Sequence, residues 1–84
     1  MTEGASRGEP PRFVRELTVA RVRDEADHAE VIFLESARFY RLPKADPRFD
    51  SLLALLRRAL EEQRPVRVEQ ASADSDLIAD VQLP

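Results

Sequence analysis

One amphipathic segment lies between two prolines, DPRFDSLLALLRRALEEQRP at residues 46–65, and it leaves few folds open to the rest of the chain. Its apolar side chains recur at the spacing of one helical face: Phe49, Leu52, Leu53, Leu56, Ala59 and Leu60. Asp46 suits the N-cap, Pro47 suits the first helical position, and Pro65 prevents the helix from continuing. The pattern predicts a single helix over residues 47–63 with one face in the core.

Residues 13–23, FVRELTVARVR, precede the helix as an alternating segment with a slip. Leu17 and Val19 lie on one face of a regular strand, whereas Ala20 and Val22 lie on the other. Side chains repeat every two residues in a strand, so burial of both pairs requires a bulge or bend near Val19–Ala20. The segment predicts a strongly bent first strand, as small barrels require.

Residues 30–42 hold the remaining β pattern before the helix. EVIFLE is apolar on both faces, and ARFYRL alternates and is aromatic, so the segment predicts one long strand or two. After the helix, Val66 and Val68 predict a short strand. A last strand is predicted at residues 77–83, with Leu77, Ala79, Val81 and Leu83 on one face and Ile78 on the other.

The order strand, strand, an optional third strand, helix, strand, strand predicts an α+β fold. The stretch FDSLLALLRRALEEQRPVRVEQ, followed by LIADVQL, is similar to the helix-strand-turn-strand ending of small bacterial OB-fold domains. That resemblance implies a small, mostly antiparallel β-barrel or sheet with its one helix between strands three and four. With only two strands before the helix, the alternative is a four-stranded antiparallel sheet with the helix packed on one face.

The chain is short, at 84 residues, and has no cysteine, so it holds one core without disulfides or thiolate metal ligands. Residues 1–11 are rich in glycine, proline and polar side chains and predict a disordered tail, followed by one domain at residues 12–84. No segment resembles a secretory signal, and none approaches the roughly 18 apolar residues of a membrane span. We therefore expect a cytoplasmic protein that does not interact with membranes.

Catalytic and metal-binding patterns are sparse in this sequence. His28 is the sole histidine and lies in an acidic, polar turn, where a solvated side chain is expected. Asp74, Asp76 and Asp80 lack the spacing of a calcium loop, and both glycines fall in the predicted tail, away from any phosphate-binding loop. The sequence therefore predicts no enzyme, no metal site and no cofactor.

The candidate binding site lies on the β segments. Phe39 and Tyr40 are adjacent and must point to opposite faces; we expect Phe39 in the core and Tyr40 outside, beside Arg38. In OB-folds, strands two and three form the usual ligand face, where aromatic rings stack on bases and arginines meet phosphates. The predicted binding residues are therefore Arg21, Arg23, Arg38 and Tyr40. The opposite expectation for Tyr40 is a buried ring with its hydroxyl hydrogen-bonded at the surface.

These features predict a small bacterial-type binding or interaction module without catalytic activity. The small core makes self-association or binding of another protein a way to gain stability. Leu55, at the edge of the helical stripe, would serve as a dimer contact, but a solvated helix face is the favoured alternative. The alternative is single-stranded nucleic-acid binding through the arginine and tyrosine face. The net charge of −3 opposes that alternative.

Overall fold

The computed structural model describes residues 13–84; the predicted tail, residues 1–11, lies outside the described residues. The described part contains one helix and five strands: β1 Phe13–Asp24, β2 His28–Phe33, β3 Phe39–Pro43, α1 Phe49–Glu62, β4 Pro65–Gln70 and β5 Ile78–Gln82. Residues 30–42 thus contribute to two strands, separated by a turn. The order β-β-β-α-β-β confirms the predicted α+β class.

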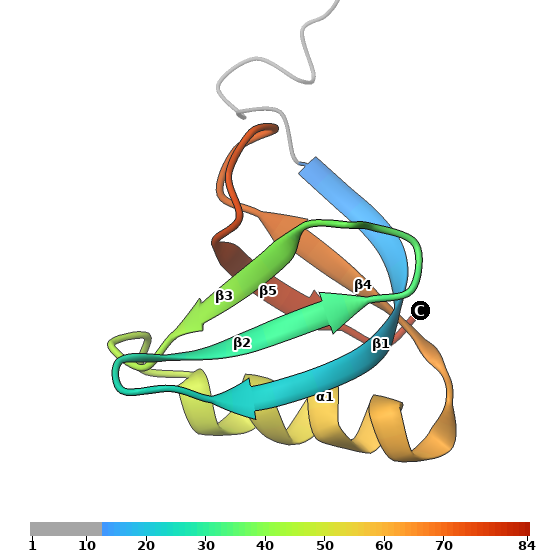
Figure 1. Ribbon diagram of the computed structural model, residues 1–84, viewed down its shortest axis with the longest axis horizontal. Helices are drawn as coiled ribbons and strands as arrows, with labels where there is room; N and C mark the ends of the chain where they lie inside the picture. The colour runs from blue at the N-terminus through green and yellow to red at the C-terminus, as the bar shows by residue number, and fades with distance from the viewer. Residues whose placement is uncertain (1–12) are drawn as a thin grey trace, which may run out of the picture.

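The five strands form one antiparallel sheet in the order β3-β2-β1-β4-β5 (Figure 1). The sheet curves strongly, but it is not closed into a barrel. Its edge strands approach at one isolated parallel bridge, between Arg41 of β3 and Leu77 just before β5. The structure therefore has the open-sheet form of the prediction, with one strand more than the four-stranded alternative.

A bulge in β1 produces the bend that the sequence predicts. The first half of β1, Phe13–Thr18, pairs with β4, and the second half, from Val19 onward, pairs with β2. The β1–β2 register shifts between Val19 and Arg21. Because of this extra residue, Ala20 and Arg21 are both exposed and Val22 turns back toward the core.

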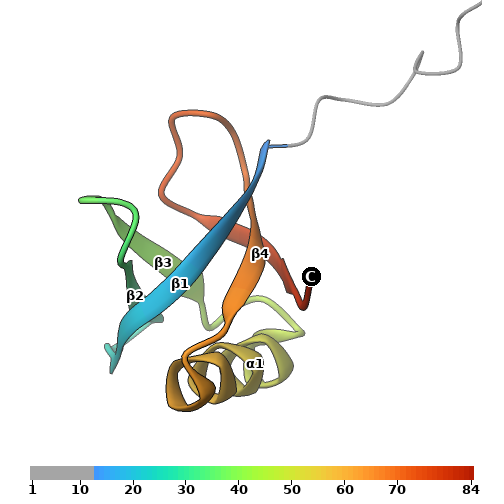
Figure 2. The ribbon, with the colours of Figure 1, turned by 90° about the vertical axis from the view of Figure 1, so that its right-hand side faces the viewer.

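Helix α1 lies across one end of the curved sheet, opposite the loop that joins β4 to β5 (Figure 2). Its predicted apolar stripe is confirmed: Leu52, Leu56 and Ala59 are buried, and Phe49, Leu53 and Leu60 pack against the core. The helix begins at Phe49, two residues later than predicted. Asp46 instead closes a turn before the helix, where its Oδ1 accepts the backbone N–H of Arg48 at 2.8 Å.

The C-terminal end of α1 depends on a left-handed residue. Gln63 has φ 56° and ψ 41°, and its N–H donates to the carbonyl of Leu60 at 3.3 Å. The N–H of Arg64 donates to the carbonyl of Ala59 at 3.0 Å. This pair of bonds is the Schellman arrangement, in which glycine is the usual left-handed residue.

The last strand follows a different phase from the predicted one. Ile78 and Val81 are buried, whereas Leu77 and Leu83 are exposed. The β4–β5 register shifts between Glu69, which pairs with Asp80, and Gln70, which pairs with Ile78. Ala79 is therefore an extra residue in β5, and Ile78 and Val81 come to lie on the same face although they are three residues apart. The predicted inward face is therefore correct for Val81 and wrong for Leu77, Leu83 and Ile78.

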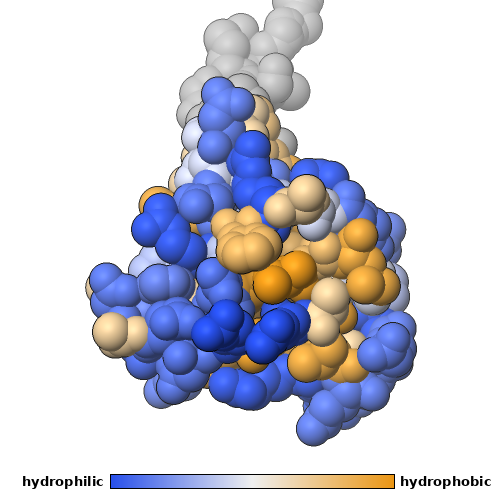
Figure 3. Space-filling model, in the orientation of Figure 1, coloured by the Kyte–Doolittle hydropathy of each residue, from blue (hydrophilic) through white to orange (hydrophobic). Residues whose placement is uncertain are grey.

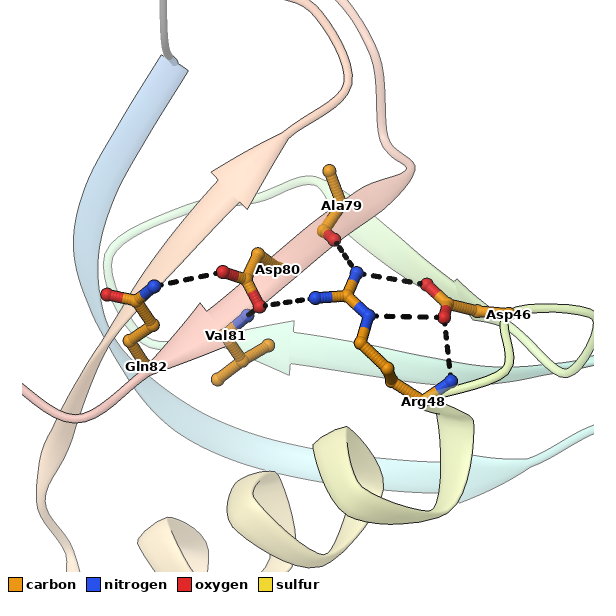
Figure 4. Close-up of polar contacts among 6 residues, drawn as sticks. All are labelled: Asp46, Arg48, Ala79, Asp80, Val81 and Gln82. Atoms are coloured by element: carbon orange, nitrogen blue, oxygen red, sulfur yellow. Dashed lines mark hydrogen bonds and ion pairs between the residues drawn. The ribbon is translucent and has the colours of Figure 1, made fainter.

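Arg48 joins the start of α1 to the edge strand β5 (Figure 4). Its guanidinium donates to the carbonyl of Ala79 at 2.7 Å and to Oδ1 of Asp80 at 3.1 Å. It also contacts both carboxylate oxygens of Asp46 at 3.4 Å. Hydrogen bonds from the backbone N–H and the side chain of Arg48 lower the pKa of Asp46. One side chain thus satisfies a carbonyl on the open edge of the sheet and two carboxylates.

Candidate functional site: the outer face of the sheet

Three residues from three strands form one row on the convex side of the sheet. Arg21 lies opposite Ile32, and Ile32 lies opposite Phe39. In the next row, Glu30 lies between Arg23 and Arg41. Their neighbours along the strands, Val31 and Tyr40 among them, are buried. We call the exposed side the outer face, defined by Arg21, Arg23, Glu30, Ile32, Phe39 and Arg41.

The prediction that Phe39 enters the core while Tyr40 faces outward is wrong. Tyr40 is 0% exposed and Phe39 is 56% exposed. The phase of β3 is set by the residues that follow, because Leu42 shares a face with Tyr40 and Arg41 shares a face with Phe39. Burying Arg41 without a partner would cost several kcal/mol, whereas exposing one phenylalanine gives up about 2 kcal/mol. The arginine therefore decides the phase.

Tyr40 is held from both ends. Its ring packs against Phe33, and its hydroxyl accepts a hydrogen bond from Nη1 of Arg15 at 3.2 Å. A buried tyrosine with a satisfied hydroxyl is the alternative that the sequence left open. The ring is therefore not accessible for stacking on a ligand.

The arginines of the outer face differ in how their charge is balanced. Nη1 of Arg23 lies 3.9 Å from Glu30, and its Nε lies 3.7 Å from Glu25. Nη2 of Arg41 donates to Asp76 at 3.0 Å, and this hydrogen bond lowers the pKa of Asp76. Arg21 forms no ion pair with any carboxylate in the part of the chain from 13 to 84. Among residues 13–84, Arg21 is therefore the cation of this face without a carboxylate partner.

An apolar patch occupies the middle of this side of the molecule and is surrounded by hydrophilic side chains (Figure 3). Its residues on the strands are the paired neighbours Ile32 and Phe39. Leu34, in the turn after β2, is 67% exposed, and Phe39 projects from the start of β3. Monomeric proteins rarely leave large contiguous apolar patches in water unless the patch binds something.

The four predicted site residues do not form one site. Arg21 and Arg23 share the outer face, and Tyr40 lies in the core. Arg38 precedes β3 and donates from Nη1 to the carbonyl of Ser75 at 3.1 Å, at the end of the sheet away from α1. Phe39 belongs to the outer face although the sequence assigned it to the core. Whether any of these residues binds a ligand stays a prediction.

The sole histidine does not form part of a larger polar cluster. Nδ1 of His28 lies 2.7 Å from Oδ1 of Asp27, and this contact lowers the pKa of Asp27. Among residues 13–84, no three histidine, aspartate or glutamate side chains are grouped as metal ligands would be. Within the same residues, no helix has the length and apolar character needed to cross a membrane.

The fold is similar to part of a known enzyme precursor. Two solved structures match it: pro-protein-glutaminase, with a TM-score of 0.75 over 88% of this chain, and its A47Q2 mutant, with a TM-score of 0.71 over 87%. Sequence identity is 20% in both cases, and the match covers 25% of each solved chain. No protein-family model matches this sequence, and no curated protein matches it either.

This similarity contradicts the prediction that the chain is not an enzyme, because both neighbouring structures are of an enzyme precursor. The chain spans a quarter of the length of those solved chains. At this level of identity, the similarity establishes a shared fold. The glutaminase activity is that of the neighbouring protein.

Proposed function

We propose that this chain is a binding domain that recognises a polypeptide through its outer face and works as part of an enzyme or beside one. The observation that carries the proposal is the exposure of Phe39 in a row with Ile32 and Arg21. Burial of one phenyl ring by a partner contributes roughly 1.5–3 kcal/mol. Interface cores are enriched in aromatic residues and arginine, which is the composition of this row.

The comparison with solved structures supports an enzyme as the partner. Both neighbours are the pro-form of an enzyme, and this chain matches a quarter of their length. A unit of this fold thus occurs within a larger enzyme precursor, where it has the rest of that chain beside it. The same relationship here would place a catalytic domain beside this chain, and the exposed Phe39 makes the outer face the contact that we propose.

Single-stranded nucleic acid is the second candidate, because Arg21 lies in the same row as an exposed aromatic ring. Stacking on an aromatic ring next to a basic side chain is a common way to hold single strands. However, Arg23 and Arg41 of the same face already contact carboxylates, and the chain has a net charge of −3. Phosphates would compete with those acids, so we favour a polypeptide.

Photo-crosslinking in cells of the source organism tests this proposal. A photoreactive benzoylphenylalanine replaces Phe39, and a matched control carries it at Arg57, which is exposed on α1 and forms no ion pair among residues 13–84. Mass spectrometry then identifies the crosslinked species. We expect a polypeptide with a catalytic domain from position 39 and not from position 57.

The other products of that experiment have definite meanings. Crosslinking to nucleic acid would support the second candidate and overturn the first. Crosslinking to a second copy of the chain would support the predicted self-association. Equal products from positions 39 and 57 would remove the outer face as a specific site. The cytoplasmic location belongs to this proposal and is tested by cell fractionation before crosslinking.

A further inference from the structure

A cavity of about 440 Å³ lies at the end of the sheet away from α1. It is formed where the start of β1 meets the loops that join β2 to β3 and β4 to β5 (Figures 1 and 2). We call it the end cavity, and its lining includes Phe13, Val14, Arg15, Ser36, Arg38 and Gln70. Its volume falls within the range of small-molecule sites, about 300–1,000 Å³.

Two guanidinium groups line the end cavity, and neither forms an ion pair with a carboxylate of residues 13–84. Arg15 donates one hydrogen bond, to the hydroxyl of Tyr40, and Arg38 donates one from its side chain, to the carbonyl of Ser75. A guanidinium has five N–H groups, so each arginine keeps most of its donors. Five other arginines of the described chain form ion pairs with carboxylates: Arg23, Arg41, Arg48, Arg58 and Arg64.

Glu35, which senses the charge of Arg15, is already engaged by Thr18. Both oxygens of Glu35 accept hydrogen bonds from Thr18, one from its backbone N–H and one from its hydroxyl, each at 2.7 Å. These two bonds, with a smaller contribution from the charge of Arg15, lower the pKa of Glu35. Glu35 therefore stays ionised at neutral pH but has no direct contact with the guanidinium.

Arg15 is held by a buried group, and Arg38 shares its acceptor with one. Tyr40, which is wholly buried, fixes Arg15 from the core side. Gln70 is 6% exposed, and its Nε2 donates at 2.8 Å to the same Ser75 carbonyl that receives Arg38. Side chains fixed before binding lose less conformational entropy when a ligand arrives. The end cavity thus presents two positioned cations beside the apolar side chains of Phe13 and Val14.

We propose that the end cavity binds an oxyanion, a carboxylate or a phosphate, carried on a small apolar or aromatic body. Guanidinium groups bind both kinds of oxyanion through paired N–H donors. Phe13 and Val14 would contact the apolar body, while Arg15 and Arg38 hold the charged end. This site is separate from the outer face and does not depend on the proposed polypeptide partner.

NMR titration of the full chain tests the site with benzoate, phenyl phosphate and the neutral probe benzyl alcohol. We expect saturable shifts at the side-chain N–H signals of Arg15 and Arg38 and at the Gln70 amide with the two anions. The tighter of the two anions identifies the preferred oxyanion. Acetate and inorganic phosphate measure the contribution of the apolar body, and we expect both to bind more weakly.

Substitutions then connect binding to the two arginines. Arg15→Gln and Arg38→Gln should each weaken the preferred anion by on the order of ten-fold, the loss expected for a charge-assisted contact. Arg57→Gln, on the exposed side of α1, should leave it unchanged. The spectrum of each free variant reports whether it is folded. If Arg15→Gln unfolds, Arg38→Gln is decisive because Arg38 lies at the surface.

Three results would overturn the proposal. The first is the absence of saturable shifts with either anion. The second is equal binding of benzyl alcohol, since the charge would then contribute nothing. The third is unchanged anion binding by folded Arg38→Gln.

Discussion

Tyr40 packs edge-on against Phe33 in the core, with ring centroids 5.2 Å apart and an interplanar angle of 76°. Edge-to-face aromatic pairs contribute roughly 0.5–1.5 kcal/mol beyond the apolar area they bury. The pair joins β2 to β3 at the position where either Phe39 or Tyr40 can face the core. It therefore adds to the preference, set by Arg41, that leaves Phe39 on the outer face.

Substitution of Tyr40 separates the contribution of its ring from that of its hydroxyl. Tyr40→Phe should lower the free energy of unfolding by about 1 kcal/mol, because it removes the acceptor for Arg15. Tyr40→Ala should lower it by about 3–5 kcal/mol, as for other buried aromatic residues. Urea unfolding at neutral pH measures both values. A loss below about 1 kcal/mol for Tyr40→Ala would contradict the buried position.

The neighbouring residue provides the opposite test. Phe39→Ala should change the free energy of unfolding by no more than about 0.5 kcal/mol, because the ring is mainly in solvent. A partner identified by crosslinking from position 39 should bind the Phe39→Ala variant more weakly than the wild type if the outer face is the binding surface. A loss above about 2 kcal/mol would mean that the phenyl ring is packed in the isolated protein.

The left-handed end of α1 offers a route to greater stability. Gln63→Gly should raise the free energy of unfolding by about 0.5–1 kcal/mol, since glycine adopts positive φ without the steric cost of a β-carbon. Gln63→Val should lower it, because a β-branched side chain tolerates this conformation poorly. Thermal and urea unfolding of both variants measure the difference. Equal stabilities would show that residue 63 is not left-handed in solution.

Acid should lower the free energy of unfolding by protonating Glu35, whose carboxylate accepts two hydrogen bonds from Thr18. Its pKa in the folded protein is lowered from 4.5. Its contribution to stability is therefore fully present above about pH 4.5 and is lost as the pH falls through the lower folded value. Glu35→Gln should be less stable than wild type at pH 7 and should lose less stability than wild type between pH 6 and pH 3.

Glu61→Gln is the matched control for the acid measurement. This substitution removes an exposed carboxylate that has no hydrogen bond or ion pair within residues 13–84. Its stability should follow the pH dependence of wild type. If Glu35→Gln and Glu61→Gln behave alike, the bonds between Glu35 and Thr18 do not contribute to stability in solution.

Arg48 should control how tightly β5 is held at the open edge of the sheet. Arg48→Ala removes the donor to Ala79 and the ion pair with Asp80. Backbone amide exchange at Val81 and Gln82 should become faster, by roughly ten-fold. Arg58→Ala, which breaks an ion pair made with Glu62 on the helix, should leave exchange in β5 unchanged. Unchanged exchange in Arg48→Ala would show that the contacts of Arg48 with Ala79 and Asp80 do not hold the strand.

The helix and the β1 bulge could be predicted because each depends on local pattern alone. The stripe from Phe49 to Leu60 has one periodicity, and the slip between Val19 and Val22 has one simple resolution. The first residue of the helix was harder to predict, because the Asp46 carboxylate can accept a hydrogen bond from a backbone N–H in a turn as well as at an N-cap. Arg48 then joins that turn to β5, which no local pattern specifies.

The outer face was predicted only in part, because it depends on the register between strands. Arg21 and Arg23 lie on it as expected, but the choice between Phe39 and Tyr40 required the phase of β3. That signal was present in Arg41 and Leu42, which should have decided the phase before the aromatic residues were assigned. The end cavity brings together residues 15 and 70, from two strands, and residue 38, from the loop before β3, so local sequence gives no indication of it.

The extra residue in β1 determines which sequence changes this strand can accept. Without the bulge, every second residue after Leu17 and Val19 would point inward. Arg21 and Arg23 would then lie in the core, and Val22 would face water. The number of residues between Val19 and Val22 therefore decides whether the arginines of β1 lie on the outer face or in the core. Substitutions can alter single side chains there, whereas deletion of one residue would invert the entire segment at once.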